Sequence, residues 1–175
     1  MNELLKADHL TVDFSTDQGT VHAVRDVSFC VYPQEVLGIV GESGPGKSQT
    51  MYSVMGLLAD NGKITAEDIL FDGKKIHESA FKNHAEYEKT MRHIRGNDMA
   101  MIFQDPMTFL NPVLKIGTQL IEPLQNHTKM SKKECEQKAI ELMRQVGIPS
   151  PEKRMNQYPY EFSGGMRQRI IIAMA

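Results

Sequence analysis

The sequence has no tryptophan, only two cysteines in 175 residues, and no long uninterrupted apolar stretch. Cys30 and Cys135 are too few for a disulfide-stapled fold, so we expect both to be reduced thiols. No apolar run approaches the roughly 18 residues that a membrane-spanning helix needs. The charged segment at residues 1–10 is unlike a secretory leader. These absences predict a cytoplasmic globular domain, or part of a larger one.

Neither sign of charge dominates, since 20 lysines and arginines stand against 22 aspartates and glutamates. A protein whose main partner is duplex nucleic acid carries a basic excess, so we do not expect nucleic acid as a partner. The six histidines have no metal-ligand spacing, and no cysteine pair completes a metal site.

The first third of the chain alternates apolar and polar residues, which predicts β-strands on both sides of a turn at residues 16–19. Residues 36–40, Val-Leu-Gly-Ile-Val, predict a strand buried on both faces, as in a parallel sheet. A strand pair is expected around Asp72-Gly73, and residues 99–103 predict another short apolar strand. Residues 78–97 are expected to form a solvated helix and loop.

Helical patterns begin after the glycine-rich segment of residues 41–48 and dominate the last third of the chain. A first amphipathic helix is expected to end at residues 60–62. Ser131 with Glu134 predicts a capping box, and Gly147 predicts the end of the helix that the box opens. A last helix is expected to begin at Ser163.

Residues 41–48 read Gly-Glu-Ser-Gly-Pro-Gly-Lys-Ser and fit the pattern G-x-x-x-x-G-K-[ST], between an expected strand and an expected helix. Glycines let the backbone wrap an anion, and the N–H groups at the helix start point at phosphates. Lysine supplies a charge to the β- and γ-phosphates, and the serine hydroxyl is a ligand for Mg²⁺. The alternative is a glycine-rich turn with an incidental lysine. The expected nucleotide-binding residues are Gly41, Glu42, Ser43, Gly44, Pro45, Gly46, Lys47, Ser48 and Gln49.

Two further motifs follow in order. Residues 101–106 read Met-Ile-Phe-Gln-Asp-Pro, and residues 163–168 read Ser-Gly-Gly-Met-Arg-Gln. Together with residues 41–48, they resemble the Q-loop, signature motif and phosphate loop of ABC-type ATPases. Within that family the sequence most resembles the ATP-binding subunits of bacterial oligopeptide and dipeptide importers, from about Leu4 to Ala175.

The resemblance implies an α/β fold: a P-loop NTPase domain of the ABC type with an antiparallel β subdomain and a helical insert. Residues 1–103 would form the β-rich subdomain and nucleotide-binding core. Residues 104–162 would form the Q-loop and helical subdomain, and residues 163–175 the signature motif and its helix.

The resemblance also implies roles for individual residues. Lys47 and Gln104 would be catalytic, and Ser48 and Gln104 would contact Mg²⁺. The signature residues would contact ATP held by a second, facing ATPase subunit; they are Ser163, Gly164 and Gly165. The aromatic residue Phe14 would stack on adenine.

At the level of the whole protein, the family couples ATP binding and hydrolysis to peptide uptake. The implied partners are membrane permease subunits, which would dock beside Met107, Phe109 and Leu110, and a second ABC ATPase subunit. The implied location is the cytoplasmic face of the cell membrane, as a peripheral subunit.

Several alternatives stay open at this stage. Gln104 taken alone would be a surface amide, and Phe14 has the alternation of an ordinary core aromatic. For the whole chain, one alternative is a nucleotide-binding chain without catalysis. Another is a soluble ABC-type ATPase that acts outside transport.

The sequence also departs from the family pattern. It stops at Ala175, before the Walker B strand with its Asp-Glu pair and before the switch histidine, so we expect this chain alone to be marginally stable and inactive in ATP hydrolysis. Pro45 lacks an N–H, which removes one donor to the phosphates and is expected to weaken ATP binding. Gln34 replaces a usual glycine and is expected to strain its turn, and Phe109 replaces a small polar residue.

Overall fold

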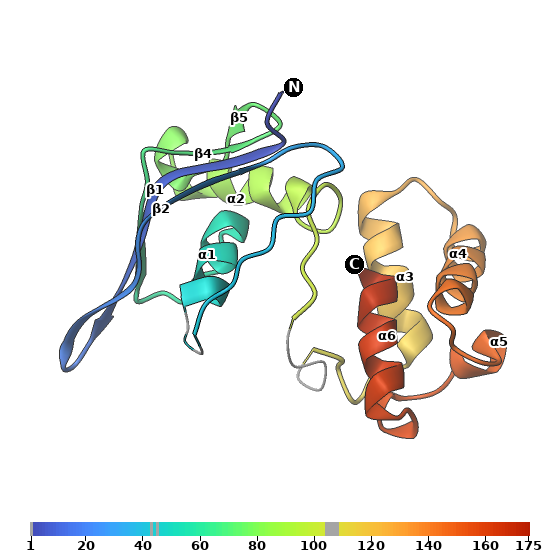
Figure 1. The fold of residues 1–175 in the computed structure, drawn as a ribbon. Coiled ribbons are helices and arrows are strands. Elements are labelled where there is room, and N and C mark those ends of the chain that lie inside the picture. Colours follow the sequence, from blue (N-terminus) through green and yellow to red (C-terminus); the bar gives the residue numbers. More distant parts are fainter. Residues whose placement is uncertain (1, 43, 45, 104–108) are drawn as a thin grey trace. The chain divides into compact units, whose positions relative to one another are not determined.

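The computed structural model describes residues 2–42, 44, 46–103 and 109–175. The chain divides into two compact units, Met1–Arg92 and His93–Ala175 (Figure 1). The first unit is built on an antiparallel sheet with helices. In the second, the regular elements of the described residues are helices, apart from one isolated bridge. This α/β arrangement, with an antiparallel β portion and a helical portion, confirms the expected fold class.

The sheet of the first unit has the strand order β2-β1-β4-β5, and β3 also pairs with β1. Every pairing is antiparallel. The predicted turn joins the two longest strands, where the Thr16 hydroxyl donates to the Gly19 carbonyl at 2.7 Å. The strands are β1 (Leu5–Thr16), β2 (Gly19–Val31), β3 (Gly62–Thr65), β4 (Asp68–Phe71) and β5 (Lys74–Lys75).

The β1–β2 pairing shifts register three times, and the first two shifts form neighbouring bulges on opposite strands. The third places one extra residue of β2, Ala23, between Val12↔Val24 and Asp13↔His22. Between the pairs Ala7↔Phe29 and Leu10↔Val27, β1 has one more residue than β2. Between Leu10↔Val27 and Val12↔Val24, β2 has the extra residue instead. Each of these two bulges contains one residue in the left-handed region, His9 with φ 51° and Asp26 with φ 52°. Histidine and aspartate are among the residues that tolerate this conformation.

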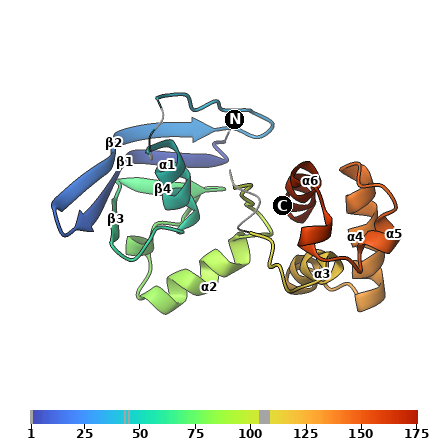
Figure 2. The same cartoon turned by 90° about the horizontal axis from the view of Figure 1, so that it is seen from below.

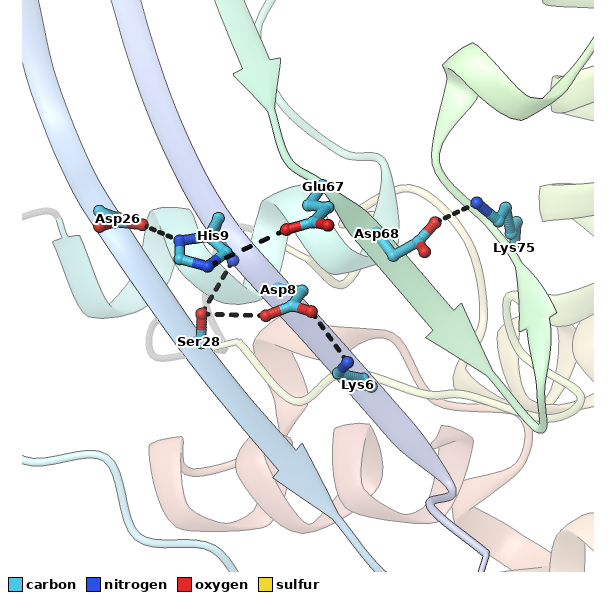
Figure 3. A network of polar contacts seen from close by, with 8 residues as sticks. All are labelled: Lys6, Asp8, His9, Asp26, Ser28, Glu67, Asp68 and Lys75. Atoms are coloured by element: carbon cyan, nitrogen blue, oxygen red, sulfur yellow. Dashed lines mark hydrogen bonds and ion pairs between the residues drawn. The ribbon is translucent and has the colours of Figure 1, made fainter.

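Side chains bond the two bulges together (Figure 3). The His9 ring Nδ1 lies 2.6 Å from the Asp26 carboxylate, and its Nε2 lies 4.0 Å from Glu67, which precedes β4. The His9 backbone N–H donates to the Ser28 hydroxyl at 2.8 Å, so the bulge leaves this donor satisfied. The hydrogen bond and charge of Asp26 raise the pKa of His9, and Asp8 and Glu67 add to the effect.

Helix α1 (Gly46–Met55) packs against β1 and β2 and ends at Gly56, whose φ of 62° is left-handed. The expected end at residues 60–62 is therefore too late, because Gly56 supplies the helix-terminating conformation earlier. The core of this unit combines buried residues of the strands and helices with the residue that follows β5: Ala7, Leu10, Val12, Val24, Val54, Met55, Ile69, Ile76, Tyr87 and Met91.

The segment predicted to be solvated forms the short 3₁₀ helix η1 (Glu78–Ala80) and α2 (His84–Ile94). One face of α2 is buried through Tyr87 and Met91, and Tyr87 meets Phe81 edge to face with ring centroids 5.6 Å apart. The prediction was wrong for this face because the many charges of α2 obscure apolar residues spaced one helical turn apart.

Two predicted strands do not form. Residues 36–40 have no strand pairing, and their apolar side chains face solvent, with Val36 95% and Val40 92% exposed. Residues 99–103 make only an isolated bridge between Arg95 and Met99. A parallel strand needs a neighbour to pair with, and no described strand supplies one to either segment. Gln34, just before the first segment, has φ 65°, so the expected strain in its turn is confirmed.

The second unit is a helical bundle of α3 (Ile116–His127), α4 (Lys132–Gln145), α5 (Pro151–Arg154) and α6 (Gly164–Met174), with the 3₁₀ helix η2 (Pro159–Glu161) before α6 (Figure 2). The capping box of Ser131 and Glu134 is confirmed, and Ser131 lowers the pKa of Glu134. Gly147, with φ 73°, ends α4, and Arg169 of α6 donates to its carbonyl at 2.7 Å.

A continuous apolar core holds the bundle together. Its buried residues come from three of the helices and the segments between them: Leu110, Ile116, Leu120, Ala139, Met143, Ile148, Met155, Phe162, Ile170, Ile171 and Ala173. None of the helices in the described part of the chain has the length and apolar character needed to span a bilayer.

Candidate functional site

The glycine-rich loop leads directly into α1. Gly41, Glu42 and Gly44 are exposed, and Gly46 is the first residue of the helix. The first N–H groups of a helix have no partner within it, so the loop ends at a natural anion site. A Cβ at Gly46 would lie 3.0 Å from the Ala23 carbonyl of β2, so the close approach of this strand favours glycine here. Ser43 and Pro45 lie outside the described residues.

Lys47 extends its side chain along this loop. Its Nζ donates to the carbonyl of Gly41 at 3.0 Å and to that of Glu42 at 2.5 Å. The ammonium group is thus held at the loop rather than in open solvent. This position places a cation where an anion bound by the loop N–H groups would lie.

The serine and threonine hydroxyl groups of α1 fall into two classes. Thr50 and Ser53 are buried, and each donates to the carbonyl four residues earlier, Gly46 at 2.8 Å and Gln49 at 2.6 Å. Ser48 is exposed, and its hydroxyl has no hydrogen bond to any residue that the structure describes. Of the three, Ser48 is the one available to a metal ion. Gln49 is half-buried.

A groove of about 470 Å³ lies beside Lys47. One wall is formed by β2, through residues that include Val24, Val27 and Phe29, and the other by α1 and the residues just before the loop. Sequence reasoning did not single out Phe29, because strand alternation alone does not distinguish it from other apolar residues of β2. Phe14 is not among the lining residues. Its ring lies against Gly62, where an added Cβ would be 2.9 Å from the ring.

The signature residues start α6 in the second unit. The Ser163 hydroxyl accepts the Met166 N–H at 3.4 Å and caps the helix. A Cβ at Gly164 or Gly165 would meet no atom of the described residues within 4 Å, and neither glycine has a positive φ. Glycine costs a helix roughly 0.5–1 kcal/mol relative to alanine, so neither packing nor backbone conformation accounts for this pair. The space next to the start of α6 is open to a ligand.

Gln104 and Met107 lie outside the described residues, which flank this segment at Phe103 and Phe109. The rings of Phe103 and Phe109 stack with centroids 3.8 Å apart and an interplanar angle of 12°. Leu110 is buried in the core of the second unit, so it does not form an exposed docking residue as predicted. Phe109 remains substantially exposed.

The structure therefore brings the predicted residues together in two groups. The loop glycines, Lys47 and Ser48 form one group at the start of α1 in the first unit. Ser163 and the two glycines that follow it form the other at the start of α6 in the second unit. Each group combines helix N–H donors with a hydroxyl, which suits the oxygens of a phosphate.

Comparisons with known proteins agree with this chemistry. The model of the ABC transporter family matches residues 24–175. The chain is 51% identical over 176 residues to the dipeptide transport ATP-binding protein DppD of Bacillus subtilis (strain 168), covering 100% of this chain and 50% of that protein. It is 48% identical over 172 residues to the oligopeptide transport ATP-binding protein OppD of Escherichia coli (strain K12), covering 98% and 49%.

Solved structures share the fold. The dimeric post-hydrolysis structure of the ATP-binding cassette MJ0796, bound to ADP and Pi, gives a TM-score of 0.77 at 24% identity over 97% of this chain and 68% of that chain. CbiO1 from Clostridium perfringens, part of the ABC transporter complex cbiONQ, gives 0.70 at 25% identity over 99% and 61%. The chain spans about half the length of the curated relatives it matches.

Proposed function

Because the chain belongs to the ABC transporter family, we propose that it is part of an ATP-binding subunit that couples ATP binding and hydrolysis to uptake of oligopeptides or dipeptides. The names of its relatives, dipeptide and oligopeptide transport ATP-binding proteins, support this substrate class. The observation that carries the proposal is the position of the Lys47 ammonium group, held at the carbonyls of the loop that starts α1.

In this proposal the phosphates of ATP lie on the loop of residues 41–48. The loop N–H groups and Lys47 would bind the β- and γ-phosphates. The Ser48 hydroxyl, unused by the described residues, fits a ligand of Mg²⁺, and the metal would neutralise phosphate charge. Gln104 keeps its expected role at the metal and γ-phosphate. Phe14 remains the candidate for adenine stacking, although its ring contacts Gly62.

The start of α6 would bind the γ-phosphate of ATP held by a second ATPase subunit. The open space at Gly164 and Gly165 supports this assignment, because a bound phosphate needs close access to their N–H groups. The dimeric form of the neighbouring structure, MJ0796, supports a paired arrangement. The membrane permease subunits would be the other partners, which puts the protein on the cytoplasmic face of the membrane.

The bare apolar segment at residues 36–40 supports a further part of the proposal. The relatives are about twice as long as this chain, and we propose that a longer polypeptide supplies strand neighbours to this segment. The same polypeptide would supply the carboxylates that hold Mg²⁺ and orient water. For the 175-residue chain alone, we expect ATP binding without measurable hydrolysis.

The test compares Lys47→Met with Lys89→Met, which replaces an exposed lysine of α2. In the full-length protein, Lys47→Met should weaken ATP binding about tenfold or more, because a hydrogen bond to a charged group is worth about 1.5–3 kcal/mol. Lys89→Met should bind ATP as the wild type does. Calorimetry measures binding, and phosphate release measures hydrolysis. Wild-type protein that binds no ATP, or Lys47→Met that binds it equally well, would contradict the proposal.

Transport is tested separately from nucleotide binding. Co-purification of the full-length protein with membrane permease subunits, and peptide-dependent stimulation of its ATPase, are the expected results. An ATPase that remains soluble and unstimulated by peptide would instead favour a role outside transport.

A further inference from the structure

Gln119 is a buried polar residue of the second unit whose side chain forms its hydrogen bonds with one turn, residues 111–114. It lies near the start of α3 and is only 5% exposed. Its Oε1 accepts the Asn111 N–H at 2.9 Å, and its Nε2 donates to the carbonyls of Asn111 and Leu114, both at 3.0 Å. All three hydrogen bonds therefore hold residues 111–114 against α3.

The turn that Gln119 holds also has hydrogen bonds of its own. The Leu114 N–H donates to the Asn111 carbonyl at 3.2 Å, and the Val113 N–H donates to the Asn111 side chain at 3.1 Å. These bonds shape the turn but do not attach it to the bundle. The attachment comes from Gln119 and from the buried side chain of Leu110. Loss of the Gln119 amide would remove the hydrogen-bond partner of the Asn111 N–H and of the Leu114 carbonyl, which favours movement of the turn away from α3.

The attachment matters because of what precedes it in the chain. The Phe103–Phe109 stack ties the residue before positions 104–108 to the residue after them. Gln119 then ties the following turn to α3. The two ends that flank Gln104 in the sequence are thus joined to each other and anchored to the helical bundle.

We propose that Gln119 is a positioning residue for ATP hydrolysis: its amide holds against α3 the turn of residues 111–114, which follows Gln104 in the chain. The inference rests on the proposed function, in which Gln104 contacts Mg²⁺ and the γ-phosphate. Gln119 touches neither, and acts only through the turn of residues 111–114. A displacement of about 1 Å in a catalytic group can slow a reaction about a hundredfold.

The experiment uses the full-length protein assembled with its transport complex. Gln119→Met has a similar length but makes none of the three hydrogen bonds. Gln119→Glu keeps the acceptor for the Asn111 N–H and loses both donors. The matched control is Gln125→Met, on the exposed side of the same helix. For each protein, kcat and KM for ATP, the affinity for a non-hydrolysable ATP analogue, and amide hydrogen exchange at Asn111 and Leu114 are measured.

Both Gln119 variants should lower kcat about tenfold to a hundredfold and leave KM and analogue affinity nearly unchanged, since the phosphate loop is intact. Exchange of the Asn111 amide should accelerate about tenfold in Gln119→Met, because its acceptor is gone. Gln125→Met should match the wild type in all four measurements.

The results separate the inference from the function on which it rests. Wild-type protein that hydrolyses no ATP overturns the proposed function. Wild-type activity with an unchanged kcat in Gln119→Met, or unchanged exchange at Asn111, overturns the inference alone. A parallel loss of analogue affinity and kcat in both variants also overturns it, because that pattern reports general damage to the fold.

Discussion

Two apolar runs adjoin the glycine-rich motifs of this chain, and they have opposite surroundings. Residues 36–40, before the phosphate loop, are exposed and unpaired. Ile170 and Ile171, after the signature residues, are buried against the other helices of the bundle. The difference lies in the partners rather than in the runs. The partners of α6, namely α3 and α4, lie in the described chain, whereas no described strand pairs with residues 36–40.

The largest expected difference in stability is between variants that truncate one side chain in each run. Ile170→Ala should destabilise the 175-residue chain by about 2–5 kcal/mol, because Ile170 is fully buried and its loss leaves a cavity. Val40→Ala should change stability by less than about 0.5 kcal/mol, because Val40 is 92% exposed. Urea denaturation followed by circular dichroism measures both.

The same pair tests whether a longer polypeptide covers residues 36–40. In the full-length protein, Val40→Ala should become clearly destabilising if other strands bury that side chain. A Val40→Ala effect that stays near zero in the full-length protein would show that the run remains bare, against the proposed role of the remaining polypeptide.

A smaller effect distinguishes two glycines of the helical unit. A Cβ at Gly117 would lie 2.6 Å from the Met155 carbonyl, so Gly117→Ala should cost about 1–3 kcal/mol through a backbone clash. The methyl group of Gly165→Ala would meet none of the residues that the structure describes within 4 Å, so this variant should stabilise α6 by up to about 1 kcal/mol. Thermal unfolding of the two variants provides the comparison.

The ATPase activity of Gly165→Ala should not follow its stability. In the full-length protein, Gly165→Ala should lose ATP hydrolysis despite its added stability, since the new methyl group enters the space left for phosphate. Retention of full activity by Gly165→Ala would show that the open space at the start of α6 is not a ligand site.

The smallest expected effect is electrostatic and belongs to the sheet of the first unit. Asp26, with help from Asp8 and Glu67, raises the pKa of His9 above its unfolded value of about 6.5. The stabilisation is therefore fully present below that unfolded pKa and is lost as the pH rises through the raised, folded pKa. Asp26→Asn should flatten this fall of the melting temperature as the pH rises above about 6.5. An NMR titration that finds the His9 pKa at or below 6.5 would contradict the prediction.

Local signals made much of the fold predictable. The turn at residues 16–19, the Ser131–Glu134 capping box and the Gly147 helix end each depend on residues close together in sequence. Their geometry needs no distant partner, so the pattern alone specifies it. The phosphate loop before α1 was predictable for the same reason.

Features that depend on distant residues were not predictable. Residues 36–40 have strand composition, but pairing is a property of the neighbouring chain. The Gln119 side chain joins α3 to the turn of residues 111–114 through hydrogen bonds that no periodicity in the sequence predicts. Phe29 lines the groove beside Lys47 because of how β2 lies over α1, and nothing in the alternation of β2 marks it.

The opposed bulges of the β1–β2 hairpin have a consequence for how this sequence tolerates changes in length. The extra residue of β1, at His9, and the first extra residue of β2, near Asp26, cancel, so Val12↔Val24 has the same register as Ala7↔Phe29. The third shift, at Ala23, is not compensated. Deleting either residue alone would move part of one strand by one position and turn its buried side chains toward solvent. Deleting both would remove these two bulges and leave a regular ladder from Leu5 to Val12. These two extra residues are therefore expected to be inserted or deleted together rather than singly.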